Sequence, residues 1–275
     1  MNVDVLLTRI AIAVYVTAGA MSLFRLTGRS GRMIPVIRGV MAFGWLMHTV
    51  AFLARWRATY ATGYGHVPVT NRYESLVFFG WCLALAWLVL APKWPAAGTA
   101  AGMQLGAAVM TAAAGLLPGS SPEIEPLMPA LRSNWLLFHV VTCFLAYAAF
   151  AAATFVAIRV LIRNQAVPGE KSPNFDADSF MHRMISVGFF LLTLGILSGS
   201  AWAQQSWGRY WGWDPKEVWS LITWIIYAIF LHARISRGWT GKRLALVAIA
   251  GFLAVLITYL GVNYLPLLQG LHSYA

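Results

Sequence analysis

Residues 134–162, NWLLFHVVTCFLAYAAFAAATFVAIRVLI, decide the fold class of this chain. The stretch is apolar along nearly its whole length, and Arg159 is its one Lys, Arg, Asp or Glu residue. An α-helix needs about 20 such residues to cross roughly 30 Å of hydrocarbon. The sequence therefore predicts a transmembrane helix at this position.

Similar apolar runs occur along the whole chain. They predict further spans at residues 4–25, 37–54, 73–91, 97–117, 182–203, 218–236 and 244–266. The composition is 59% hydrophobic and 11% charged, whereas soluble proteins are about 25% charged. This composition excludes a soluble enzyme, a disordered protein and a disulfide scaffold. We expect an all-α polytopic membrane protein with about eight transmembrane helices, folded as one membrane domain over residues 1–275.

Positive charge is concentrated in alternate loops, which predicts how the chain crosses the membrane. The loops near residues 25–38, 92–96, 159–183 and 234–243 hold 13 of the 20 Lys and Arg residues. Because basic loops stay in the cytoplasm, we expect both termini outside, although Arg55, Arg57 and Arg72 fall in the predicted outer loop 55–72. The same rule accounts for the net charge of +11, so we expect no nucleic-acid partner.

An outer segment at residues 202–219, WAQQSWGRYWGWDPKEVW, is unusually rich in tryptophan. It contains five of the 13 tryptophans, namely Trp202, Trp207, Trp211, Trp213 and Trp219. Tryptophan belts at membrane surfaces usually supply one or two rings per helix end, so this density predicts an aromatic shelf for a large planar ligand. If the segment is helical, Trp207 and Trp211 share one face.

The end of this segment has the signature of a helix start. Asp214 is a good N-cap, Pro215 suits the first helical position, and Glu217 completes a capping box. This role does not exclude contact with a ligand. Arg209 and Lys216 are both basic, and either can pair with carboxylates of a ligand. Cys82 and Cys143 lie inside apolar runs and are expected to be small buried hydrophobic residues.

These motifs resemble a known family. The pattern WGxxWxWDPKE at 207–217 resembles the tryptophan-rich "WWD" signature of heme-handling proteins. Together with PVTNRYES at 68–75 and LPLLQGLHSYA at 265–275, it is similar to the CcsA/ResC family, a subunit of the system II cytochrome c synthase. The role of Glu74 in the second motif stays open between a polar network beneath the shelf and a helix cap after Asn71.

Histidines provide candidate axial ligands, because imidazole is the commonest ligand of heme iron. On the predicted topology His139 and His272 both lie outside, at the level of the tryptophans. In the family one outer histidine precedes the WWD segment and another follows it, so the resemblance implies that these two ligate heme. His66 and His182 are expected not to be ligands.

Two further histidines lie within predicted spans. His232 lies 14 residues past Val218, about 21 Å down its helix, and an ionisable residue there is a functional candidate. The alternative is a helix-end histidine that snorkels beside Arg234. The family places a transmembrane heme ligand at this position. His48 is either another intramembrane ligand or a packing residue.

The resemblance also implies a function. The chain would bind heme b, deliver it to the outer face of a bacterial inner membrane and present it for thioether attachment to the CxxCH motif of apocytochrome c. It would be the core subunit of this lyase without supplying a nucleophile, and it would need a ResB/CcsB-like membrane partner. A thylakoid membrane is the weaker alternative. The rival functions are a CcmC-type heme transporter or chaperone and a heme-bearing electron-transfer subunit.

Overall fold

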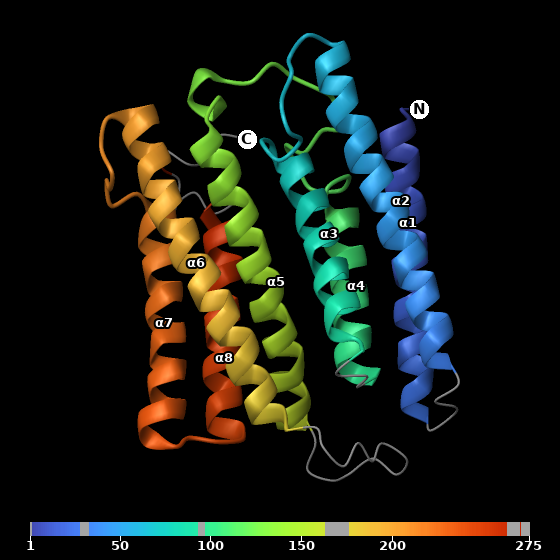
Figure 1. Ribbon diagram of the computed structural model, residues 1–275, viewed down its shortest axis with the longest axis vertical. Coiled ribbons are helices and arrows are strands. Elements are labelled where there is room, and N and C mark those ends of the chain that lie inside the picture. The colour runs from blue at the N-terminus through green and yellow to red at the C-terminus, as the bar shows by residue number, and fades with distance from the viewer. Residues whose placement is uncertain (1, 28–32, 93–96, 163–175, 263–269, 271–275) are drawn as a thin grey trace. The chain divides into compact units, whose positions relative to one another are not determined.

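The computed structural model describes residues 2–27, 33–92, 97–162, 176–262 and 270, and the regular secondary structure of these residues is entirely helical (Figure 1). The helices are α1 (Val3–Phe24), α2 (Met33–Ala61), α3 (Arg72–Leu90), α4 (Ala97–Ala113), α5 (Asn134–Ile162), α6 (Ala177–Trp207), α7 (Pro215–Arg237) and α8 (Lys242–Leu256). Three short elements accompany them: the 3₁₀ turns η1 (Arg25–Thr27) and η2 (Pro129–Leu131) and the π-helical turn η3 (Ile257–Gly261).

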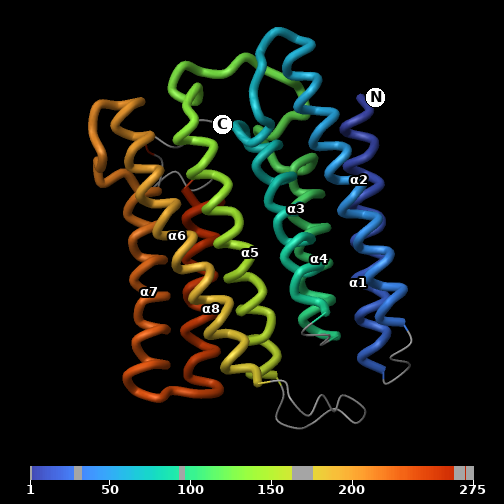
Figure 2. Tube along the Cα trace, in the orientation of Figure 1, coloured from blue at the N-terminus to red at the C-terminus, as the bar shows by residue number. Residues whose placement is uncertain are grey.

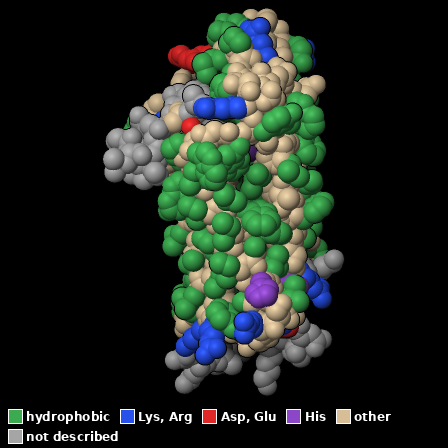
Figure 3. Space-filling model, turned by 90° about the vertical axis from the view of Figure 1, so that its left-hand side faces the viewer, with side chains coloured by type: hydrophobic (Ala, Val, Ile, Leu, Met, Phe, Trp, Pro, Cys, Tyr) green, Lys and Arg blue, Asp and Glu red, His purple; other side chains and the backbone are tan. Residues whose placement is uncertain are grey.

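Seven of the described helices are long and apolar enough to cross a membrane, and α4, with 17 residues, is slightly shorter. Figure 3 shows one face of the molecule, on which hydrophobic side chains cover the central part and Lys and Arg gather towards the ends. The prediction of an all-α membrane protein with about eight spans is confirmed. The side on which each terminus lies stays a prediction.

The clearest difference from the predicted spans is at α2, which ends at Ala61 instead of near residue 54. Arg55 and Arg57 therefore lie in the last two turns of a helix, and the prediction that they belong to an outer loop is wrong. A span predicted from hydropathy ends at the first charged residue. The helix itself can continue past that residue when the charged side chain forms ion pairs or hydrogen bonds. Arg55 has such partners in Asp4 of α1 and Glu74 of α3.

The described chain divides into two compact units. The first contains α1 to α4 and the loop up to Met128, and the second begins at Pro129 and contains α5 to α8. In each unit the helices run alternately up and down, as the Cα trace shows (Figure 2). In the first unit α1 packs on α2 and α4, and in the second α5 packs on α6 and α8. The expectation of one domain over residues 1–275 stays a prediction.

The closest packing in the second unit is between α5 and α6. Small residues let two membrane helices approach each other, and here three glycines of α6 face side chains of α5. A Cβ atom added to Gly188 would meet the ring of Phe150, one on Gly195 the sulfur of Cys143, and one on Gly199 the ring of His139. This glycine face determines how deeply His139 sits between the helices.

Candidate functional site

A cleft lies at one end of the second unit, where α5 begins and α6 ends. Its lining comes from α5, α6, the loop 208–214, α7 and η3, and includes His139, Cys143, Trp202, Trp211, Lys216 and Glu217. The mixture is an imidazole, a thiol, aromatic rings and one pair of opposite charges. Such a lining suits a ligand with an aromatic body and anionic groups.

His139 is held in a defined orientation within this cleft. Its Nδ1 lies 2.6 Å from the carbonyl oxygen of Gly195 on α6, and 3.7 Å from the sulfur of Cys143. Because a carbonyl only accepts hydrogen bonds, Nδ1 carries the proton and the lone pair of the neutral ring is on Nε2. The ring lies nearly parallel to that of Trp202, at 12° with 6.5 Å between centroids. Metal-binding histidines commonly have this arrangement, in which the second nitrogen donates to a carbonyl.

The tryptophan segment is only partly helical. α6 ends at Trp207, where Gly208 adopts the left-handed conformation with φ +73°, and residues 208–214 form a loop. The condition under which Trp207 and Trp211 would share a helical face is therefore not met, because a left-handed glycine terminates the helix between them. Trp202 and Trp207 instead meet edge to face, with centroids 4.8 Å apart.

The five tryptophans have different surroundings. Trp202 is 1% exposed and its indole N–H donates to the carbonyl of Ala130 at 2.7 Å. Trp211 lines the cleft and meets Trp213 edge to face at 5.8 Å. Trp213 is 70% exposed and has a φ of +56°, a conformation that is uncommon for a residue with a Cβ. Trp207 and Trp219 are half-buried.

The predicted capping box is confirmed. The Asp214 carboxylate accepts from the backbone N–H of Lys216 at 3.0 Å, and Glu217 Oε2 accepts from the N–H of Asp214 at 3.1 Å. Glu217 also accepts from the N–H of Gly212 at 2.8 Å. These bonds fix the loop to the start of α7 and so position Trp211 and Trp213.

Lys216 and Arg209, the two candidates for pairing with a carboxylate of a ligand, lie in different surroundings. Lys216 lines the cleft, whereas Arg209 is exposed and its guanidinium packs over Gly212, where an added Cβ would lie 2.7 Å from Nε. Lys216 is thus better placed than Arg209 to pair with an anionic group of a ligand in the cleft.

The predicted ligand His272 lies outside the described residues. Gly270 is described, and it lies against the start of α7, where an added Cβ would be 2.8 Å from Pro215 Cδ and closer still to the Asp214 carboxylate. The chain two residues before His272 therefore passes beside the cleft.

His232 and His48 are not part of this cleft. His232 is exposed on α7, 17 residues beyond Pro215 and so about 26 Å from the start of the helix. His48 is fully buried in the first unit, where its Nδ1 lies 3.2 Å from the hydroxyl of Tyr15. Among the described residues its Nε2 has no partner. The Tyr15 contact provides a packing role for His48.

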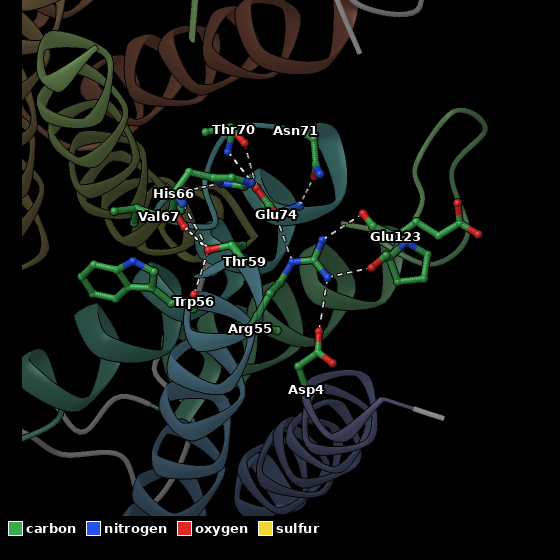
Figure 4. A network of polar contacts seen from close by, with 12 residues as sticks. Asp4, Arg55, Trp56, Thr59, His66, Val67, Thr70, Asn71, Glu74 and Glu123 are labelled. Atoms are coloured by element: carbon green, nitrogen blue, oxygen red, sulfur yellow. Dashed lines mark hydrogen bonds and ion pairs between the residues drawn. The ribbon is translucent and has the colours of Figure 1, made fainter. Parts of the chain in front are cut away.

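The first unit contains a buried ionic network at the end where α1 and α3 begin and α2 ends (Figure 4). Arg55 is 4% exposed and donates from Nε to Glu74 at 2.9 Å and from Nη1 to Asp4 at 3.2 Å. It also donates to the carbonyls of Pro122 and Glu123, at 2.7 and 3.2 Å, in the loop that follows α4. Arg55 thus joins three helices and a loop.

The PVTNRYES motif supplies the other half of this network. Asn71 caps α3 by accepting from the N–H of Glu74 at 2.8 Å, while the Glu74 side chain, 1% exposed, binds Arg55 and the backbone and hydroxyl of Thr70. Arg72 donates to the carbonyl of Pro118 at 2.6 Å. Glu74 thus belongs to a buried polar network of the first unit and Asn71 is the cap of α3, while a position of this network beneath the shelf stays a prediction.

Sequence reasoning missed three features of these sites. Cys143 was expected only as a buried hydrophobic residue, but it lines the cleft beside His139. Gly195 and Gly199 form a small-xxx-small pattern, and this spacing was a detectable signal of close helix packing. Arg55 directly follows the apolar stretch 37–54, and its carboxylate partners lie 19 and 51 residues away.

Comparison with known proteins identifies the family. The profile of the family described as "Cytochrome C assembly protein" matches residues 69–272. The chain belongs to this family. The matched range includes the PVTNRYES motif from Val69 onwards, all of the second unit's described helices and the cleft.

Individual relatives agree with this family. The chain is 38% identical to "Cytochrome c biogenesis protein CcsA" of Synechococcus sp. (strain CC9902), over 87% of this chain and 86% of that protein. It is 38% identical to the protein of the same name from Chlamydomonas reinhardtii, over 88% and 69% of the two chains. The CcsA/ResC resemblance is confirmed.

A solved structure shares the fold. "Cytochrome c Heme Lyase CcmF" superposes on 94% of this chain with a TM-score of 0.73 at 20% sequence identity. The chain spans about half of that protein, 47% of its length. At this identity the likeness concerns the fold alone.

Proposed function

We propose that this chain acts in cytochrome c maturation as the heme-binding and heme-delivering membrane subunit of a cytochrome c synthase. It presents heme b at the outer face of the membrane for thioether attachment to the CxxCH motif of apocytochrome c. The observation that carries the proposal is His139, whose Nδ1–H is fixed by the Gly195 carbonyl in a cleft lined by Trp202 and Trp211. The family membership supports the same function.

The donor set suits heme better than a bare metal ion. Among the described residues no three His, Cys, Asp or Glu side chains converge as a metal site. A heme iron brings four nitrogen ligands of its own and needs only axial donors from the protein. Nε2 of His139 provides one axial donor, and Trp202 and Trp211 provide aromatic walls for the ring. Lys216 provides a positive charge for a propionate.

His272 supplies the second axial imidazole in this proposal. Its support is the position of Gly270 against Asp214 and Pro215, which directly precede the cleft residue Lys216, together with the family pattern. Two neutral imidazoles fill both axial positions of a heme and so limit access of oxygen to the iron.

The enclosed part of the cleft has a volume of about 60 Å³, which holds only a few water molecules. A ligand of the size of heme is larger than this space, so in the proposal it protrudes from the cleft or displaces the loop 208–214. This loop is not helical and is held at its end by Glu217, and its Trp213 is 70% exposed. Trp213 and Tyr210, both exposed, are available to cover a ring that protrudes from the cleft.

The protein positions its substrates and supplies no nucleophile. Each substrate thiol adds across one vinyl group of the heme: a carbon–sulfur bond forms, the double bond becomes single, and the thiol proton moves to the second vinyl carbon. The thiols belong to the apocytochrome. The contribution of this chain is orientation and exclusion of water.

We further propose that the chain works in a bacterial inner membrane with a ResB/CcsB-like subunit. The exposed His232 supports this part, because a histidine on the outer surface of a transmembrane helix is accessible to a second chain. In the proposal His232 ligates a transmembrane heme upstream of the outer site.

The test is covalent product formation. The chain, its partner and a CxxCH apocytochrome are produced together in a host that lacks every other maturation system, and heme is stained on a denaturing gel. We expect a stained cytochrome band with the wild-type chain and its loss with His139→Ala or His272→Ala. His182→Ala, at a half-buried position away from the cleft, is the control. Undiminished product with both alanine variants would refute the outer site, and bound heme without product would favour a carrier of the CcmC type.

A further inference from the structure

We propose that Gly195 and Gly199 of α6 are positioning residues for His139: the carbonyl of Gly195 sets the tautomer of the imidazole, and the missing side chain of Gly199 provides the space for its ring. This inference rests on the proposed role of His139 as a heme ligand. It assigns a function to the face of α6 that packs against α5.

The carbonyl of Gly195 acts on the protonation of the ring. It accepts from Nδ1–H of His139 at 2.6 Å, a short distance for an N–H···O bond. A strong bond at Nδ1 raises the basicity of Nε2 and fixes the plane of the ring. The hydroxyl of Ser198 lies 3.0 Å from the same carbonyl and 2.7 Å from the carbonyl of Leu194, so it divides its one proton between these two acceptors.

Gly199 acts sterically, by leaving room for the imidazole ring of His139. A Cβ atom at this position would lie 2.6 Å from Nδ1, 2.8 Å from Cε1 and 3.3 Å from Cγ of His139. These distances are shorter than van der Waals contact and involve the ring close to its attachment, not the end of a flexible chain. An alanine here displaces the imidazole from its place, and the displaced ring loses the Gly195 bond.

Gly188 provides a matched control on the same helix. Its added Cβ would lie 2.5 Å from the ring of Phe150, also on α5. The steric conflict is of the same size and affects the same helix pair, but it does not involve the cleft. Gly188→Ala therefore reports what tighter packing between α5 and α6 does by itself.

The experiment is a double-mutant cycle on the purified complex with its partner, read out as the absorption spectrum of bound heme. Because partners of a metal-binding histidine contribute roughly 10–100-fold to affinity, Gly199→Ala should weaken heme binding at the outer site by a factor in this range. In a His139→Ala background, Gly199→Ala should have no further effect, whereas Gly188→Ala should change binding equally with and without His139.

Added imidazole provides a second readout. It should restore the spectrum of His139→Ala and of the His139→Ala/Gly199→Ala double variant to the same extent, because the free ligand does not depend on the position of the missing ring. The inference would be overturned if the losses of heme binding from His139→Ala and Gly199→Ala added up in the double variant. An unchanged spectrum of Gly199→Ala would overturn it as well. An unchanged spectrum in His139→Ala alone would instead overturn the proposed function.

Ser198→Ala keeps the inference testable if Gly199→Ala does not accumulate. This variant removes the side-chain donor that competes with His139 for the Gly195 carbonyl, so the bond from Nδ1–H strengthens and Nε2 becomes a stronger donor to the iron. We expect a lower midpoint potential of the outer heme, because a more basic ligand favours the oxidised iron. A potential equal to that of the wild type would contradict the role of Gly195.

Discussion

At the scale of single residues, the start of α7 depends on the Asp214 side chain. Its carboxylate accepts from the N–H of Lys216, and Glu217 returns the bond to the N–H of Asp214. The same short segment holds Gly212 and hence the loop that carries Trp211. The capping box of Asp214 and Glu217 therefore stabilises both the start of a helix and the wall of the cleft.

Replacement of Asp214 separates its capping role from its charge. Asp214→Ala should lower the free energy of unfolding by about 1 kcal/mol, because an N-cap is lost. Asp214→Asn should cost little, since asparagine caps as well as aspartate does. Thermal unfolding of the purified protein in detergent checks both variants. Equal destabilisation by the two substitutions would show that the charge, and not the cap, is what matters.

At this scale, contacts between residues close in sequence were predictable, and contacts between distant residues were not. The capping box was predictable because all its partners lie within four positions of one another. The orientation of His139 was not, because the Gly195 carbonyl lies 56 residues further along the chain. Likewise, the tryptophan-rich segment was recognised, but the end of α6 at Gly208 within it was not, because a positive φ is available to any glycine.

At the scale of the elements, Arg55 determines how the helices of the first unit meet. It lies in the last turns of α2, and its ion pairs reach Asp4 at the start of α1 and Glu74 at the start of α3. Its side chain also lies 4.9 Å from the centroid of the Tyr73 ring. A single guanidinium, with its fork of donors, serves all these partners at once.

Removal of Arg55 should therefore be severe. Arg55→Leu leaves two buried carboxylates without their cation, and breaking a buried ion pair costs about 3–5 kcal/mol. Arg57→Leu is the matched control, because Arg57 is exposed two residues further along the same helix, and surface substitutions usually change stability by about 0.5 kcal/mol or less. Accumulation in the membrane and the unfolding temperature measure the difference. Similar values for the two variants would contradict the account of the network.

The network also explains the error in the predicted end of α2. The arginines at 55 and 57 favoured a loop because ionised side chains are costly in an apolar environment. Arg55 is tolerated there because its partners come from α1, α3 and the loop after α4. Their convergence is a property of the tertiary structure and has no local signal in the sequence.

At the scale of the whole molecule, two four-helix units each carry a polar cluster at one end. In the first unit the cluster is ionic and is built on Arg55, and in the second it is the cleft around His139. The segment between α4 and α5 is bonded in both units, by Arg55 to Pro122 and Glu123 and by Trp202 to Ala130. The number of helices and their approximate bounds were predictable from hydropathy, whereas the division into two units was not, because it depends on which helices pack together.

His232 is expected to determine part of the heme content of the complex. It is exposed on α7 and lies about 26 Å from the start of that helix, so the role proposed for it is separate from the cleft. His232→Ala should lower the total heme content of the complex with the partner, measured per protein by pyridine hemochrome. Full heme content and full cytochrome maturation in this variant would make His232 an ordinary helix-end histidine.

The most direct test of the central claim, that His139 holds heme in the cleft, is the absorption spectrum of the reduced complex. The wild-type protein should show the bands of a low-spin heme with two axial histidines. His139→Ala should lose the contribution of the outer heme, and added imidazole should restore it together with cytochrome maturation. A His139→Ala complex with the spectrum and heme content of the wild type would contradict the account.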